Sequence, residues 1–247
     1  MLKYCTVLKV FAILSVGVAL SIGCVYSISR QEEGVSGFTI ISFLLSFVIP
    51  VILALYALIV SLKAQTKLHG LMILLLSYIS LIFSFASAYY AISWNGDMND
   101  ATEQYYYYND LREMWQKEKP DPAYRTESSR AFKGMEARLL SGIEELARPL
   151  NYQQDAKNAP VREIMRLTAY YDSKSPRYKY GIKYHAEAKW EVFLDCIHYS
   201  IVTMATVGYC DIVPQSRLAK GMTDIQIISG QVLFLFALGI VFGKSTG

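Results

Sequence analysis

The sequence lacks cysteine in its longest polar stretch. The four cysteines are Cys5, Cys24, Cys196 and Cys210, and none lies between residues 93 and 191. A disulfide-stapled domain is therefore excluded for that stretch. The three histidines are scattered along the chain, so the sequence contains no His/Cys cluster with metal-ligand spacing. We predict neither an enzyme nor a cofactor.

Charge is missing from four long apolar stretches in a chain that is 53% hydrophobic. They run from about residue 10 to 28, 38 to 62, 71 to 92 and 225 to 242, and none contains Asp, Glu, Lys or Arg. Each is close to the ~20 apolar residues that cross a bilayer as a helix. The first three also lack a regular arginine ladder, which argues against a voltage sensor. The sequence predicts four transmembrane helices.

Basic residues between these stretches predict the orientation. They precede the first stretch, connect the second to the third and follow the fourth: Lys3, Lys9, Lys63, Lys67 and Lys244. Because Lys and Arg concentrate in cytoplasmic loops, both termini are predicted in the cytoplasm and residues 94–189 outside. A cleaved signal is an alternative for the first stretch, because lysines precede its apolar core. A bacterial inner membrane is the favoured location.

A short motif lies about a dozen residues before the fourth apolar stretch. Residues 206–211 are Thr-Val-Gly-Tyr-Cys-Asp, with Thr203 three positions before them and Pro214 three after. This motif resembles the signature of the potassium-channel pore family, Thr-Val-Gly-Tyr-Gly-Asp, with Cys210 in place of the second glycine. The resemblance covers about residues 192–243. It implies a filter in which backbone carbonyls replace the hydration shell of K+.

The resemblance implies the roles of the motif residues. The permeant K+ would be coordinated by backbone carbonyls, and by one hydroxyl, of Thr206, Val207, Gly208 and Tyr209. Cys210 and Asp211 would form the filter mouth. A ring of carbonyls needs four pore loops and each chain has one, so a homotetramer is implied. Glycine suits position 208 because it enters left-handed backbone conformations without a Cβ penalty.

The residues around the filter acquire supporting roles from the same resemblance. His198, Tyr199 and Thr203 would brace the filter from a pore helix predicted over residues 190–205. The negative end of that helix dipole would favour a cation at the filter. Gly230 occupies the position of a hinge in the inner helix, although close packing against a neighbour suits a glycine equally well.

These assignments predict an all-α membrane protein in five parts. Residues 1–68 contain the first two transmembrane helices and 69–93 the outer pore helix. Residues 94–189 form a helical extracellular or periplasmic cap. The re-entrant pore helix and filter follow over 190–214, and the inner helix and cytoplasmic C-terminus over 215–247.

Residues 93–191, which include the cap, are polar and carry 16 acidic and 16 basic side chains, which gives no electrostatic case for nucleic acid. Apolar residues recur every three or four positions between Glu127 and Leu150, which predicts a helix. Asn158-Ala159-Pro160 is typical of a second helix start. Tyr105–Tyr108 would pack between cap helices or lie at the membrane interface. The segment Tyr170–Tyr184 would be a solvated linker or would contact lipid headgroups.

The leading interpretation is a tetrameric K+ channel that is not voltage-gated. A weakly selective cation channel is an alternative, because Cys210 replaces the last filter glycine. A four-span scaffold similar to tetraspanins is a further alternative. It is disfavoured because the large loop of that family carries a Cys-Cys-Gly motif, whereas residues 94–189 contain no cysteine.

Overall fold

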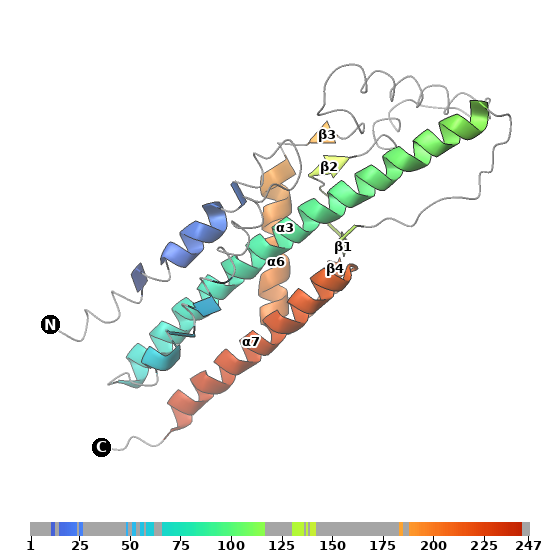
Figure 1. The fold of residues 1–247 in the computed structure, drawn as a ribbon. Helices are drawn as coiled ribbons and strands as arrows, with labels where there is room; N and C mark the ends of the chain where they lie inside the picture. Colours follow the sequence, from blue (N-terminus) through green and yellow to red (C-terminus); the bar gives the residue numbers. More distant parts are fainter. Residues whose placement is uncertain are drawn as a thin grey trace.

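Three long helices dominate the fold (Figure 1). They are α3 (Lys67–Gln116), α6 (Lys189–Met204) and α7 (Arg217–Phe242). The computed structural model describes residues 11–12, 15–23, 25–26, 48, 51–52, 55–56, 58–61, 66–116, 130–135, 137, 139–141, 183–184 and 188–243; side chains are not described for 99, 102–116, 140–141 and 183–184. The described residues of the first two predicted spans are helical, but most of those spans lie outside the described part.

Helix α3 is much longer than the sequence predicts. The apolar stretch ends near residue 92, yet the helix continues to Gln116, 50 residues in all. The sequence Asn95-Gly96-Asp97 resembles a break, but a single glycine inside a helix costs only ~1 kcal/mol. The chain contains no proline between residues 67 and 116, so nothing forces the helix to end earlier. Tyr105–Tyr108 lie on this extension, and their side chains are outside the described part.

Helices α6 and α7 lie close to their predicted positions. α6 begins and ends one residue before the predicted pore helix, and Glu191 in its first turn complements the helix dipole. α7 ends at Phe242 as predicted, but it begins at Arg217, ahead of the apolar stretch. Ser216 caps it by accepting a hydrogen bond from the backbone N–H of Ala219 at 3.1 Å.

Part of the predicted cap is not helical. The helix expected between Glu127 and Leu150 is wrong for its described residues, which form β1 (Phe132–Lys133) and β2 (Leu140–Ser141). Gly134 lies between them at a φ of +98°, which interrupts a right-handed helix. β1 pairs antiparallel with β4 (Val213–Pro214), and β2 with β3 (Lys183–Tyr184). The second predicted cap helix, at Asn158–Pro160, lies outside the described residues.

Ala131, Met135 and Leu139 nevertheless belong to the core, as their apolar spacing suggests. Each is at most 4% exposed, because β1 and its flanks pack against α3 and the loop after the filter. The periodic pattern therefore identified the buried positions correctly but predicted a helix where the chain forms short strands. The strand conformation of β1 is set by its pairing with β4, which is distant in sequence.

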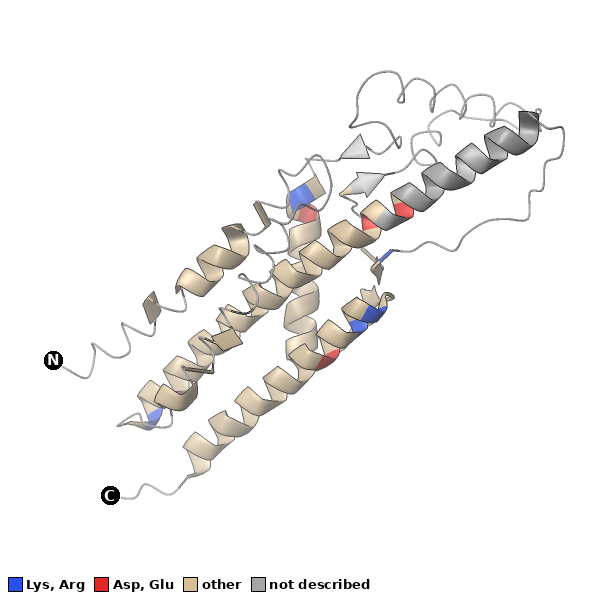
Figure 2. Ribbon diagram, in the orientation of Figure 1, with Lys and Arg blue, Asp and Glu red and all other residues tan. Residues whose placement is uncertain are grey.

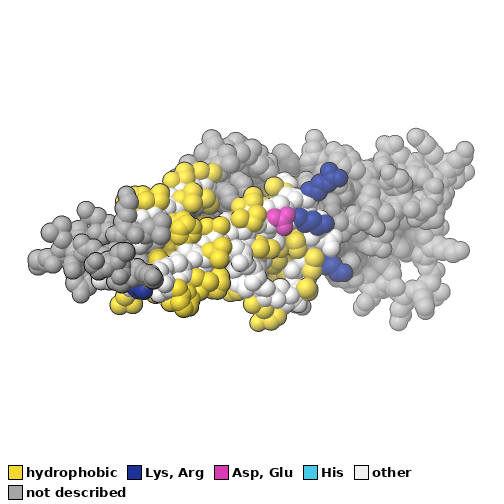
Figure 3. Space-filling view, turned by 90° about the horizontal axis from the view of Figure 1, so that it is seen from below, with side chains coloured by type: hydrophobic (Ala, Val, Ile, Leu, Met, Phe, Trp, Pro, Cys, Tyr) yellow, Lys and Arg dark blue, Asp and Glu magenta, His cyan; other side chains and the backbone are white. Residues whose placement is uncertain are grey.

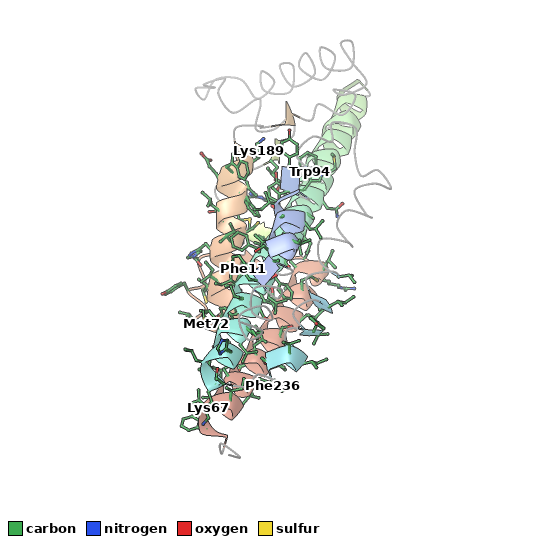
Figure 4. The ribbon with its side chains drawn as sticks, turned by 90° about the vertical axis from the view of Figure 1, so that its left-hand side faces the viewer. Phe11, Lys67, Met72, Trp94, Lys189 and Phe236 are labelled. Carbon is green, nitrogen blue, oxygen red and sulfur yellow. The ribbon has the colours of Figure 1, made fainter. Side chains whose placement is uncertain are left out.

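Two described helices are long and apolar enough to cross a membrane. They are Lys67–Met98 and Arg217–Phe242, with 32 and 26 residues and a mean hydropathy of 2.2 each. Figure 2 shows a long uncharged stretch in each of these helices, with basic residues at the start of α3 and of α7 and acidic residues part-way along both. Figure 4 places Lys67 near one end of the described helices and Trp94 and Lys189 near the other.

The helices pack into one core, in which α3 contacts both α6 and α7. The largest buried side chains include Tyr89, Tyr90 and Phe85 of α3. At the opposite end of the core, Lys67 Nζ donates to the backbone oxygens of Val241 and Gly243 at 3.0 and 2.9 Å. This lysine satisfies carbonyls that the end of α7 leaves without an intrahelical partner.

Candidate functional site

The loop that joins α6 to α7 has an alternating backbone. Thr206, Gly208 and Cys210 have positive φ angles of 56°, 58° and 60°, whereas Val207 and Tyr209 between them do not. Alternation of the sign of φ turns successive peptide units, and a run of right- and left-handed residues directs backbone N–H groups to one side of a chain. A backbone of this kind is compatible with a row of carbonyl oxygens on the other side.

The start of the loop is fastened to the last turn of α6. The N–H of Thr206 donates to the oxygen of Thr203 at 3.0 Å, and that of Val207 to the oxygen of Val202 at 3.1 Å. The N–H groups are thus satisfied inside the protein, while residues 205–211 are exposed in the single chain. The negative end of the α6 dipole points at the beginning of this loop and favours a cation there.

His198 and Asp211 brace the outer end of the loop. His198 Nε2 lies 2.8 Å from Asp211 Oδ2, and the imidazole stacks on the ring of Tyr209 at 6.4 Å with an interplanar angle of 8°. Asp211 Oδ1 accepts a hydrogen bond from the N–H of Ile212 at 2.9 Å. That backbone donor first, and His198 second, hold the pKa of Asp211 below its usual range.

The lowered pKa of Asp211 predicts how the loop responds to acid. A carboxylate with a depressed pKa keeps its bracing contacts at every pH above its ordinary value and loses them as the pH falls through the depressed value. His198→Leu removes one donor, so the acid-induced loss of ion flux should begin at a higher pH than in the wild type. His198→Gln retains an amide donor and should restore the wild-type profile. Flux titrated against pH in liposomes measures both, and identical profiles for all three proteins would refute the bracing role.

Two further predicted support residues lie behind the loop. Tyr199 is buried, and its hydroxyl lies 2.8 Å from Thr223 Oγ1 of α7. Thr203 is also buried, in the last turn of α6. The structure therefore brings His198 to the exposed side of the loop and Tyr199 and Thr203 to its protein side.

Gly230 lies inside an uninterrupted helix, against the end of α6. A Cβ at this position would lie 2.9 Å from the backbone oxygen of Met204 and 3.2 Å from its sulfur. The structure thus provides a packing reason for glycine, which allows α7 to approach α6 closely. The hinge assignment stays a prediction.

A buried polar network that the sequence reasoning missed links all three helices. Gln226 of α7 is fully buried and accepts a hydrogen bond from Tyr89 OH of α3 at 2.6 Å. Its amide nitrogen donates to Ser200 O at 2.9 Å and lies 2.7 Å from Ser200 Oγ of α6. Ser200 Oγ in turn donates to the oxygen of Ile82 on α3 at 2.9 Å. The sequence offered one sign of this network, the amide side chain of Gln226 inside the apolar run of residues 225–242. A polar group in such a stretch needs hydrogen-bond partners.

Within the described residues, no group of three or more His, Cys, Asp or Glu side chains is arranged to hold a metal ion. The two cysteines described are Cys196, which is buried, and Cys210, which is exposed. The coordination of K+ by Thr206, Val207, Gly208 and Tyr209 stays a prediction.

Comparison with known proteins supports this assignment. Residues 167–244 match the family model described as "Ion channel", which confirms the resemblance to the pore family for that segment. A stretch of 67 residues is 40% identical to the voltage-gated potassium channel Kch of Escherichia coli (strain K12). The stretch covers 26% of this chain and 16% of that relative, so the chain matches a small part of its length. No solved structure matches the chain. The matches point to a membrane-bound ion channel rather than an enzyme.

Proposed function

We propose that the chain is one subunit of a homotetrameric channel that conducts K+ passively and selectively. The alternating backbone of residues 206–210 carries this proposal. It presents carbonyl oxygens of Thr206, Val207, Gly208 and Tyr209, and such oxygens replace the water around K+ in selectivity filters. The Kch relative, named as a potassium channel, supports the same choice of ion.

The exposure of the filter supports assembly from several copies. Val207 and Tyr209 are 55% and 67% exposed in the single chain. Irregular backbone at membrane depth is tolerated only where it is buried in protein or lines a water-filled cavity. Other copies of the chain must therefore surround the loop, and four copies close a ring of carbonyls around one axis.

We base the proposed orientation on the basic residues between the predicted spans, because Lys and Arg concentrate in cytoplasmic loops. The start of α3 and the end of α7 lie at one end of the described structure, whereas β1 and β4 lie at the opposite end of α7, beside the middle of α3 (Figure 1). We assign the end with Lys67 to the cytoplasm and the filter mouth with residues 94–189 to the outside. The first three predicted spans lack an arginine ladder, so we propose that the channel does not sense voltage.

The decisive experiment is ion flux through the purified protein in liposomes. With a K+ gradient and then a Na+ gradient of equal size, we expect rapid K+ flux and little Na+ flux. Cross-linking of the same sample should yield a tetramer. Equal fluxes would contradict selectivity, and no flux of either ion from a correctly assembled protein would contradict the channel function.

Cys210 favours one alternative, a channel with weakened selectivity. Its φ of 60° is strained for a residue with a Cβ, and its thiol donates to the oxygen of Gly208 at 3.3 Å. That carbonyl belongs to the row proposed to bind K+. A hydrogen bond to it competes with the ion for the same oxygen.

Cys210→Gly is therefore expected to raise K+ flux or the K+ to Na+ flux ratio. The substitution removes the backbone strain, roughly 1–2 kcal/mol per copy, and frees the Gly208 oxygen. Cys210→Ser retains both the strain and a donor, so its flux and selectivity should match the wild type in the absence of the reagent, while its response to the reagent should be lost. The three proteins are compared in paired flux assays, with and without an external thiol reagent. Matching selectivity, conductance and reagent response in wild type and Cys210→Gly would make Cys210 neutral.

A further inference from the structure

The segment between α3 and α6, which we call the outer segment, contacts the end of the filter loop through a short strand pair. β1 and β4 lie side by side between α3 and the start of α7 (Figure 1). Their antiparallel register places Phe132 opposite Pro214 and Lys133 opposite Val213. β4 begins two residues after Asp211 at the filter mouth. We refer to residues 130–135, which contain β1, as the strap.

The strap also holds the chain where it enters the inner helix. The backbone oxygen of Ala131 accepts hydrogen bonds from the N–H groups of Gln215 at 2.8 Å and Ser216 at 3.3 Å. Ser216 is the N-cap of α7. One carbonyl of the strap therefore contacts the few residues that connect the filter to α7.

Glycine permits a close approach on each side of the strap. A Cβ on Gly96 of α3 would lie 2.6 Å from the backbone N of Ala131. A Cβ on Gly134 would overlap the backbone oxygen of Asp211, and Gly134 also has a φ of +98°. The strap is thus wedged between α3 and the filter mouth, where a larger residue at either position has to displace backbone.

The two side chains of β1 point to opposite environments. Phe132 is 2% exposed, and its ring makes edge contacts with Tyr89 of α3 and Tyr199 of α6 at centroid distances of 5.6 and 5.4 Å. Lys133 is exposed. Phe132 therefore anchors the strap in the aromatic cluster behind the pore helix, whereas Lys133 provides a position on the same strand outside that cluster.

An acidic residue of α3 fixes the remainder of the segment. Asp97 is 5% exposed, and its Oδ2 accepts a hydrogen bond from the N–H of Leu139 at 2.9 Å. Its Oδ1 lies 3.8 Å from Arg130 Nε, and Arg130 Nη2 donates to the oxygen of Met135 at 3.2 Å. Arg130 and Leu139 are consequently held against α3 where this helix continues past its apolar stretch.

From these contacts we infer that the strap positions the outer end of the filter. It holds residues 211–216 against α3, so that a displacement of the outer segment changes the backbone at Asp211 and, through it, the outermost ion site. This inference rests on the proposed channel function. The outer segment would thus contribute to ion selectivity in addition to the filter residues themselves.

The first test compares Gly134→Ala with Lys133→Ala. In Gly134→Ala the new Cβ displaces Asp211, so the K+ to Na+ flux ratio should fall roughly tenfold, the change that follows the loss of one or two net hydrogen bonds. Amide exchange at Gln215 and Ser216 should accelerate by a similar factor. Lys133→Ala changes an exposed side chain of the same strand and should leave both quantities unchanged. Unchanged selectivity and exchange in assembled Gly134→Ala would overturn the inference.

A second test keeps the inference falsifiable if Gly134→Ala does not assemble. Lys133→Cys and Val213→Cys together place two exposed cysteines at directly opposed positions, within reach of a disulfide. Oxidation fixes the strap in its native register, so amide exchange at Gln215 and Ser216 should slow at least roughly twofold and recover on reduction, while the K+ to Na+ flux ratio does not fall. The two single variants control for pairing with Cys210. A disulfide that forms without slowing this exchange, or a pair that never cross-links, would overturn the inference.

The amide-exchange measurement separates the two proposals. If the wild type conducts no K+, the proposed function fails, yet slow exchange at Gln215 and Ser216 that Gly134→Ala accelerates still demonstrates that the strap holds this loop. If the wild type conducts K+ selectively and Gly134→Ala matches it in flux and exchange, the positioning role fails and the channel function stands.

Discussion

Replacing Gly208 by alanine is expected to abolish K+ flux while the protein still assembles. Gly208 has a φ of 58°, a conformation that costs a residue with a Cβ roughly 1–2 kcal/mol. In the proposed tetramer the cost reaches about 4–8 kcal/mol, enough to favour a different backbone in the filter. Rotation of this peptide would turn the carbonyl oxygens of the middle of the filter away from the ion.

We expect the loss of K+ flux in Gly208→Ala to arise from backbone strain and not from a steric clash of the new Cβ within the subunit. A Cβ at Gly208 would meet no atom within 4 Å in the single chain. Gly221→Ala is a matched control, because Gly221 lies in α7 and a Cβ there also meets no atom within 4 Å. Liposome flux and cross-linking are measured for both variants. Wild-type K+ flux in Gly208→Ala would rule out the filter assignment.

Gln226→Leu is expected to destabilise the described core markedly. The change leaves Tyr89 OH and the backbone oxygen of Ser200 without their partner, and each buried polar group left unsatisfied costs about 1–3 kcal/mol. Because the network links α3, α6 and α7, its loss should also loosen the pore helix behind the filter. Thermal unfolding of the purified protein and amide exchange in α6 measure the two effects.

Gln231→Leu provides the comparison for this substitution. Gln231 lies in the same helix but is exposed, so the same change there should have little effect on the unfolding temperature. Tyr89→Phe and Gln226→Leu should be non-additive in the double variant, since both remove the same hydrogen bond. Additive effects, or equal stability of Gln226→Leu and the wild type, would show that the network does not hold the helices together.

The local sequence was sufficient to predict the pore helix and the left-handed backbone at Gly208 of the filter motif. The helix α6 is encoded by a run of apolar and aromatic residues whose ends are marked by Glu191 and by the filter motif. The motif places Gly208 at a left-handed position, as its lack of a Cβ predicts. These features depend on residues close to one another in the chain, so a local pattern can predict them, whereas the coordination of K+ by the filter residues stays a prediction.

The outer segment shows where such reasoning fails. The three- and four-residue spacing of Ala131, Met135 and Leu139 indicates a helix, and these side chains are indeed buried. Their backbone is decided by β4, about 80 positions further along the chain, and by the turn at Gly134. Likewise, the end of the apolar stretch near residue 92 marks the limit of hydrophobic composition and not the end of α3.

The sequence by itself determined the resemblance of residues 167–244 to ion channels and the position of the pore helix, because each depends on local pattern and chemistry. The tertiary structure decided what surrounds them. The hydrogen bonds of Gln226, the contact of Gly230 with Met204 and the strap at Gly134 join residues from different helices and strands. No local pattern specifies such pairs, since they arise only when α3, α6, α7 and β1 pack together.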